Sequence, residues 1–226
     1  MDGVLLLDFD GTLYRGDAPY QRYSEILARS MSAPDAAAYR DLVERHLRGE
    51  AGVVAGDNWE AVVLLARRFL PNDDRWQDAF LETRAYMLGP ECHLEVPNAL
   101  PALLADARGK VHVVVASNSP EAAVRPLLAK LGLLPYCDCI VPEAGKPEGL
   151  VALADAILRP EDPTRIFTVG DNYVNDIAPG LKRGWKTGHI SPHGYFPGPA
   201  DFRGRRLEDV LPGVRRWLNE IGTGSG

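Results

Sequence analysis

The sequence has few cysteines, few lysines and no long apolar run, and each shortage excludes a class of protein. Three cysteines among 226 residues, two of them at 137 and 139, form neither an even disulfide framework nor a CxxC zinc motif. A reduced, cytoplasmic protein is therefore expected. The apolar runs at 4–7, 61–66 and 111–116 are too short to cross a bilayer, and acids flank the first, unlike in a signal peptide.

Basic residues are too scattered for a protein that binds nucleic acid or a membrane surface. The net charge is −6, and no block of lysine or arginine stands out. Apolar residues make up 46% and charged residues 25% of the chain, which is the composition of a soluble globular protein. A length of 226 residues allows one large domain, or a core domain with a smaller one inserted.

The most informative feature is a pair of acids that directly follows the first apolar run. Residues i and i+2 of a strand share a face, so Asp8 and Asp10 can both point out of one strand end. Open α/β sheets bind their ligands at the carboxyl ends of their strands. Two neighbouring acids repel each other, and a chain tolerates them best where a cation binds or a proton moves. The alternative is an acidic strand end followed by a turn at Gly11.

Residues 19–88 show only helical periodicity, whereas strands and helices alternate from Pro97 onward. This alternation predicts an α/β fold with a doubly wound, Rossmann-like parallel sheet that includes the N-terminal strand. The helical block is then an insertion, which gives a core domain of residues 1–16 and 95–226 and a helical cap domain of residues 17–94. The predicted strands are 4–8, 111–116, 139–141, 165–169 and 187–190. The predicted helices are 19–31, 35–48, 57–70, 73–88, 98–108, 120–131, 149–158, 177–183 and 207–220.

Three further polar clusters follow predicted strands. Ser117 and Asn118 precede a helix, where a hydroxyl and backbone N–H groups form either an anion site or an N-cap. Lys146 leads into another helix, and an ammonium group is a good partner for carboxylate and phosphoryl oxygens. Asp171 and Asp176 bracket a turn, an arrangement that suits a hard cation. Four clusters at one end of a sheet predict a site for Mg²⁺ and a dianion, and hence phosphoryl transfer.

These clusters, in this order, resemble the signature of the haloacid dehalogenase-like (HAD) hydrolase superfamily. The DxDGT motif at 8–12, the serine at 117, the lysine at 146 and the GDxxxxD motif at 170–176 match the family pattern. The resemblance covers about residues 1–16 and 95–200. The helical insertion is similar, in architecture only, to the C1-type cap of the phosphoglycolate phosphatase-like branch.

The resemblance implies roles for the residues that act on the substrate. Asp8 would be the nucleophile that forms an aspartyl-phosphate intermediate. Asp10 would protonate the leaving alkoxide and then take a proton from water, and Thr12 would hold Asp10 in place. Ser117 and the backbone N–H of Asn118 would bind phosphoryl oxygens.

The resemblance also implies a charge-neutralising lysine and a magnesium ion. Lys146 would neutralise charge between Asp8 and the phosphate. Mg²⁺ would bind the Asp8 carboxylate, the backbone carbonyl of Asp10, and Asp171. Asp176 would be either a direct ligand or a ligand through water.

The motifs do not identify the residues that select the substrate. The glycine-rich segment at 49–56 either reaches toward the catalytic crevice or is a plain flexible connection. The roles of Asn172 and Asn175 also stay open. The candidates for substrate contact are Arg15, Arg45 and Trp59.

The residues favour a Mg²⁺-dependent phosphatase that acts on a small phosphorylated metabolite. Asp10 argues against a dehalogenase, because halide needs no proton and dehalogenases resemble a pattern with tyrosine at that place. No lysine occurs between residues 1 and 109, which excludes a phosphonate hydrolase that forms a Schiff base on its cap. A phosphosugar mutase remains an alternative, and a non-catalytic phosphoacceptor or a binding-only relative a weaker one. Monomer and homodimer are both open.

Overall fold

The computed structural model describes residues 3–50, 53–72, 74–158 and 162–223. Residues 51 and 52 of the glycine-rich segment and residue 73 of a predicted helix therefore lie outside the described residues. The chain divides into two units, which we call the core unit (Met1–Arg15 with Val96–Gly226) and the helical unit (Gly16–Glu95).

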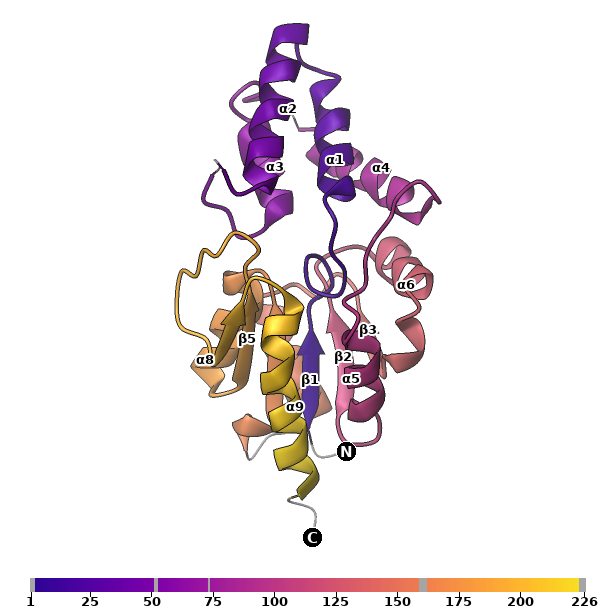
Figure 1. The fold of residues 1–226 in the computed structure, drawn as a ribbon, viewed down its shortest axis with the longest axis vertical. Coiled ribbons are helices and arrows are strands. Elements are labelled where there is room, and N and C mark those ends of the chain that lie inside the picture. The colour runs from indigo at the N-terminus through magenta and orange to yellow at the C-terminus, as the bar shows by residue number, and fades with distance from the viewer. Residues whose placement is uncertain (1–2, 51–52, 73, 159–161, 224–226) are drawn as a thin grey trace. The chain divides into compact units, whose positions relative to one another are not determined.

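A six-stranded, all-parallel sheet in the order β3-β2-β1-β4-β5-β6 organises the core unit (Figure 1). The predicted α/β fold class is confirmed. The sequence does not predict the sixth strand, because the residues of that strand form no apolar run. The strands are β1 (Val4–Leu7), β2 (His112–Ala116), β3 (Cys139–Val141), β4 (Ile166–Gly170), β5 (Lys186–Ile190) and β6 (Phe202–Gly204).

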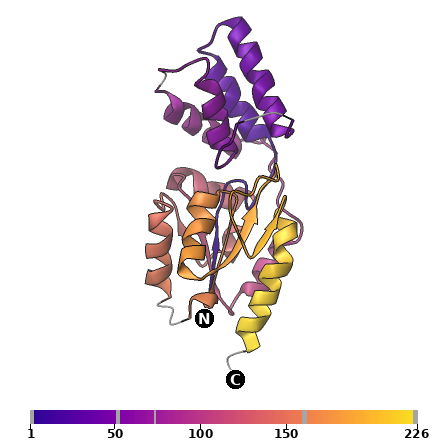
Figure 2. The ribbon, with the colours of Figure 1, turned by 90° about the vertical axis from the view of Figure 1, so that its left-hand side faces the viewer.

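Helices cover both faces of this sheet (Figure 2). On one face, alternate strand residues such as Val4 and Leu6 pack with Leu150 of α7. On the other face, the Phe167 ring of β4 meets the Trp217 ring of α9 edge-on, with the centroids 5.5 Å apart. The central strand β1 is therefore apolar throughout, as a strand buried on both faces is. The helices of the core unit are α5 (Leu100–Ala107), α6 (Glu121–Lys130), α7 (Glu148–Ile157), α8 (Ala178–Arg183) and α9 (Leu207–Thr223).

The strand order changes direction at β1, and this change positions the site. The chain moves from β1 to β2 and β3 on one side, and then crosses to β4, β5 and β6 on the other. Leu7 of β1 is in register with Val115 of β2 and with Val169 of β4. The segments that follow these three strands consequently leave the sheet at nearly the same level. Parallel sheets bind ligands at such a switch point.

The described residues of the helical unit form four helices with their own apolar core. Tyr23, Tyr39 and Leu65 are buried in it, with Trp59 packed against them. The Asp57 carboxylate accepts a hydrogen bond from Glu60 N at 2.8 Å and thereby caps the helix that begins at Asn58. Each predicted helix is present among the described residues, with shifted ends. The helices are α1 (Ala18–Ala28), α2 (Ala33–Leu47), α3 (Asn58–Ala66) and α4 (Trp76–Leu88).

Within the described part of the chain, no helix combines the length and the apolar composition that a membrane span requires.

Candidate active site

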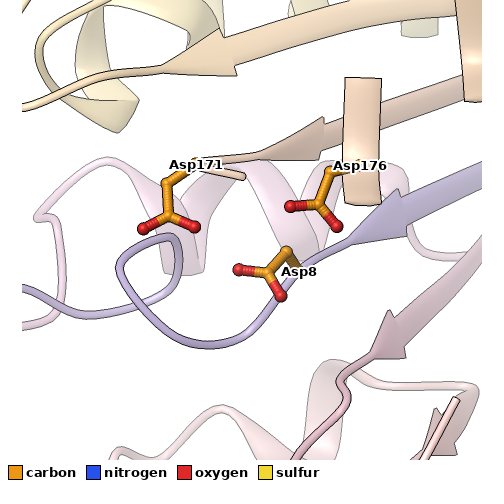
Figure 3. A group of neighbouring side chains, drawn as sticks. All are labelled: Asp8, Asp171 and Asp176. Carbon is orange, nitrogen blue, oxygen red and sulfur yellow. The ribbon is translucent and has the colours of Figure 1, made fainter. Parts of the chain in front are cut away.

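Three carboxylates converge at the carboxyl ends of β1 and β4 (Figure 3). Asp8 directly follows β1, Asp171 directly follows β4, and Asp176 lies in the π-helical turn Tyr173–Ile177. One oxygen from each carboxylate lies within 4.8 Å of the others. The pairing of β1 with β4 brings the first two together, and the turn returns Asp176 to the same place.

Two glycines allow the backbone to pass close to these acids. An added Cβ at Gly11 would lie 2.0 Å from Asp171 Oδ2, and Gly11 has a φ of +73°. An added Cβ at Gly170 would lie 2.3 Å from Asp176 Oδ2. Any larger residue would displace a carboxylate at either position. The spacing of the acids therefore depends on both glycines.

A buried lysine bridges two of the three carboxylates. Lys146 Nζ donates to Asp8 Oδ1 at 2.7 Å and to Asp176 Oδ1 at 2.6 Å, and its side chain is 3% exposed. Asn118 fixes the segment that carries this lysine. Lys146 N donates to Asn118 Oδ1 at 2.8 Å, and Asn118 Nδ2 donates to Lys146 O at 3.1 Å. The side chain of Asn118 thus has a structural task that the sequence did not reveal.

The charges of this cluster do not balance. Burial raises the pKa of Asp8, and it raises the pKa of Asp176 to about 7, although Lys146 opposes both shifts. Burial would lower the pKa of Lys146, but Asp176 and Asp8 together raise it above its usual value. When all three carboxylates are ionised, the single ammonium leaves an excess of negative charge. An oxygen-only donor set with such an excess fits a divalent hard cation such as Mg²⁺.

The contact predicted between Thr12 and Asp10 is wrong. The Thr12 hydroxyl donates to Asp8 Oδ2 at 3.0 Å, so that it supports the other acid. The reason is a helical turn after β1, in which Leu13 N donates to Phe9 O at 3.0 Å. Residues four apart share a side of such a turn, which pairs Thr12 with Asp8.

Asp10 accepts hydrogen bonds from two residues that the sequence did not single out as site residues. The Tyr14 hydroxyl donates to Asp10 Oδ1 at 2.5 Å, and the Ser119 hydroxyl donates to Asp10 Oδ2 at 2.9 Å. Tyr14 lies four residues beyond Asp10, so the helical turn could have indicated it. Ser119 comes from the segment after β2, and only the fold brings it to Asp10.

The phosphate-binding role predicted for Ser117 remains a prediction. Ser117 directly follows β2 and is buried. Its hydroxyl oxygen accepts a hydrogen bond from Ser119 N at 3.1 Å, and its N–H donates to Val141 O at 3.0 Å. Both bonds fix the segment between β2 and α6, at the same end of the sheet as the three carboxylates.

The asparagines of the GDxxxxD motif shape its turn. Asn172 Oδ1 accepts from Asn175 N at 3.2 Å, which caps the π-helical turn. Asn172 N donates to Asp176 Oδ2 at 3.2 Å. His189 of β5 supports the same turn, with its Nε2 3.2 Å from the carbonyl oxygen of Asp171. Asn172 therefore orients an acid of the cluster.

The three candidates for substrate contact have other partners. Arg15 forms an ion pair with Glu208 at 3.0 Å within the core unit. Arg45 is an exposed residue of α2 whose Nη1 lies 3.8 Å from Asp41. Trp59 packs in the aromatic core of the helical unit. Their predicted contact with a substrate stays a prediction for Arg15 and Arg45, whereas the position of Trp59 is explained by packing.

A family model of haloacid dehalogenase-like hydrolases matches residues 3–183 of the chain. The magnesium-bound candidate HAD hydrolase YfnB from Bacillus subtilis is 15% identical, with a TM-score of 0.64, over 94% of this chain and 98% of that one. A HAD phosphatase from Thermococcus onnurineus is 19% identical, with a TM-score of 0.58, over 94% and 97%. A candidate β-phosphoglucomutase from Thermotoga maritima is 15% identical, with a TM-score of 0.61, over 95% and 99%. At these identities the likeness concerns the fold alone. No curated protein sequence matches the chain.

Proposed function

Because this chain belongs to the haloacid dehalogenase-like hydrolases, we propose that it is a Mg²⁺-dependent phosphatase that cleaves a small phosphomonoester. Its family membership confirms the resemblance read from the motifs. One observation carries the proposal: the neighbouring acids Asp8 and Asp10 have different hydrogen-bond partners. Asp8 contacts Lys146 and lies in the carboxylate cluster, whereas Asp10 is held by two hydroxyl groups. This separation suits a nucleophile and a proton carrier.

In the first step, a carboxylate oxygen of Asp8 attacks phosphorus and the bond from phosphorus to the ester oxygen breaks. Asp10 gives its proton to the leaving alkoxide. Lys146, 2.7 Å from Asp8, offsets the negative charge that nucleophile and phosphoryl group bring together. The Ser117 hydroxyl and the Asn118 N–H bind phosphoryl oxygens.

In the second step, water attacks the phosphorus of the aspartyl-phosphate. Asp10 accepts a proton from that water, the bond between phosphorus and the Asp8 oxygen breaks, and inorganic phosphate leaves. Thr12 and Lys146 hold the two Asp8 oxygens through both steps, because they bond Oδ2 and Oδ1 respectively. Asp10 is thereby returned to the protonated form with which the cycle began.

The carboxylates of Asp8, Asp171 and Asp176 would hold Mg²⁺, with the Asp10 carbonyl as a further proposed ligand. The bound ion supplies positive charge that neutralises the phosphoryl oxygens. We further propose that the helical unit acts as the cap that selects the substrate. The three cysteines are free thiols, which fits the cytoplasm as the proposed location.

Phosphate release tests the proposal. Purified enzyme is assayed for inorganic phosphate with para-nitrophenyl phosphate and a panel of phosphorylated metabolites, in Mg²⁺ and in EDTA. We expect Mg²⁺-dependent release that Asp8→Asn abolishes. Asp106→Asn is the matched control, because Asp106 is an exposed acid of the core unit that forms a surface ion pair with Lys110 at 2.6 Å. Full activity of Asp8→Asn would overturn the nucleophile. Phosphate retained on a rearranged sugar, followed by phosphorus NMR, would indicate a mutase.

A further inference from the structure

We propose that Tyr14 is a positioning residue for the proton transfer, and that with Ser119 it clamps the Asp10 carboxylate. Tyr14 donates to one carboxylate oxygen and Ser119 donates to the other. This inference rests on the proposed function, in which Asp10 carries the proton. It adds a specific cause for the orientation of Asp10.

The clamp joins two separate segments of the core unit. Tyr14 follows β1 in the chain, and Ser119 follows β2. Ser119 is itself fixed, because its N–H donates to Ser117 Oγ at 3.1 Å and its carbonyl accepts from Glu143 N at 3.0 Å. The two donors therefore approach Asp10 from supports that do not depend on each other.

The packing around Tyr14 holds its ring, and therefore its hydroxyl group, in one place. The residue is 1% exposed, and its ring meets the Phe9 ring edge-on with the centroids 5.3 Å apart. A packed ring has few rotamers, so its hydroxyl is delivered to a fixed point. An aspartate has two rotatable side-chain bonds, and a donor on each of its oxygens selects one orientation. Such orientation is a large part of the advantage of a catalytic group.

The clamp is compatible with both protonation states of Asp10. A carboxylate oxygen accepts more than one hydrogen bond, so a donor on each oxygen does not prevent protonation of either. The hydroxyl of Ser119 can also rotate to suit the protonated form, whereas the phenol of Tyr14 is confined near its ring plane. Tyr14 is therefore the constant part of the clamp.

The dependence of kcat/KM on the leaving group distinguishes a positioning role of Tyr14 from a merely structural one. An alkoxide needs a proton in order to leave, whereas para-nitrophenolate leaves without one. Tyr14→Phe keeps the ring, and it leaves the contacts of Asp8 with Thr12 and Lys146 in place. Attack by Asp8 on para-nitrophenyl phosphate should then proceed, while attack on an alkyl phosphate should slow.

The experiment compares kcat/KM for para-nitrophenyl phosphate and an alkyl phosphate in Tyr14→Phe, Ser119→Ala and Asp10→Asn. For Tyr14→Phe we expect a loss of about 10- to 100-fold on the alkyl phosphate, which is part of the general acid–base contribution, and of about twofold or less on the aryl ester. Because the second step also needs Asp10, a burst of para-nitrophenolate should precede slow turnover. Ser119→Ala should show the same pattern to a smaller degree.

Tyr39→Phe is the matched control, because it removes another buried tyrosine hydroxyl, which donates to Val62 O in the helical unit. It should change the two substrates equally. Equal losses on both substrates for Tyr14→Phe, or no loss, would overturn the clamp if Asp10→Asn still shows the leaving-group dependence. Activity that persists in Asp8→Asn would instead overturn the proposed function.

Discussion

Replacement of Lys146 by methionine tests whether the buried lysine stabilises the carboxylate cluster. Methionine fills similar space but carries no charge. It would leave Asp8 and Asp176 without an ammonium that now lies 2.7 and 2.6 Å from their oxygens. These side chains are 9% and 2% exposed, so water cannot replace the lysine well. Loss of one partner from a buried ion pair costs about 3–5 kcal/mol, and we expect Lys146→Met to fall in that range.

The cost should depend on pH, and its sign follows from the pKa shifts. Burial already raises the pKa of Asp8 and Asp176 above the value of 3.8 expected for an exposed carboxyl. Without Lys146 only backbone hydrogen bonds, from Phe9 to Asp8 and from Asn172 to Asp176, still oppose these shifts, so the folded state binds protons more tightly than the unfolded state. Stability is then lost as pH rises from about 4 toward and beyond the raised pKa values. The deficit of Lys146→Met should be larger at about pH 8 than at about pH 5.

Urea unfolding, followed by circular dichroism and tryptophan fluorescence, measures the deficit without Mg²⁺. Lys186→Met is the matched control in the core unit. Its Nζ lies 3.8 Å from Asp201 and its side chain is 39% exposed, so its loss should cost about 1 kcal/mol or less. If Lys146→Met costs no more than this control, with unchanged m-values, the buried ion pairs do not stabilise the fold and the reasoning fails. Added Mg²⁺ should restore more stability to Lys146→Met than to the control.

Three further predictions concern the metal cluster and the helical unit. Gly11→Ala would place a Cβ 2.0 Å from Asp171 Oδ2 and should weaken Mg²⁺ binding about tenfold or more by calorimetry. Gly109→Ala, also at positive φ but with nothing within 4 Å, should bind normally, and equal affinities would refute the steric argument. Asp57→Ala removes a helix N-cap and should cost about 1 kcal/mol in urea unfolding; no measurable loss would contradict the cap. Because the pKa of Asp176 is raised to about 7, Mg²⁺ should raise Tm more at about pH 8 than at about pH 5, and the opposite order would count against the site.

Most of the fold could be predicted because its central strands are apolar and their ends are polar. The exception is β6 (Phe202–Gly204), which contains Arg203 and has no apolar run. Tertiary contacts hold this edge strand in place. It pairs with β5, and the Phe202 ring stacks on Phe167 with the centroids 5.9 Å apart. Neither contact leaves a local signal in the sequence.

The convergence of the acids could also be predicted, but their hydrogen-bond partners could not. Carboxyl ends of neighbouring parallel strands meet, which brings Asp8 toward Asp171 whatever the intervening residues are. The donors depend on where strand geometry stops and a helical turn begins. That turn starts beside Asp8, so Thr12 pairs with Asp8 and Tyr14 pairs with Asp10. Residue type alone could not predict which of the two hydroxyl groups bonds to which of the two acids.

Residue type was a weaker guide in the helical unit. Trp59 is a large aromatic residue of α3, and the sequence offers it as a candidate for substrate contact. Its ring lies 5.1 Å from both Tyr20 and Phe80, so burial of apolar area explains its position. Arg84 lies over the same ring, 4.6 Å from its centroid. An aromatic residue among helices is usually part of their packing.

The surroundings of Asp10 discriminate among reactions that the fold does not separate. A magnesium-bound HAD hydrolase, a HAD phosphatase and a candidate mutase share this architecture at TM-scores of 0.58–0.64. Displacement of a halide requires a nucleophile but no proton, whereas displacement of an alkoxide requires both. A second acid oriented by Tyr14 and Ser119 can supply the proton that an alkoxide leaving group needs and a halide does not. Under the proposed function, the clamp would favour oxygen leaving groups through residues of the core unit alone, and a Tyr14→Phe enzyme should retain its nucleophile while losing that preference.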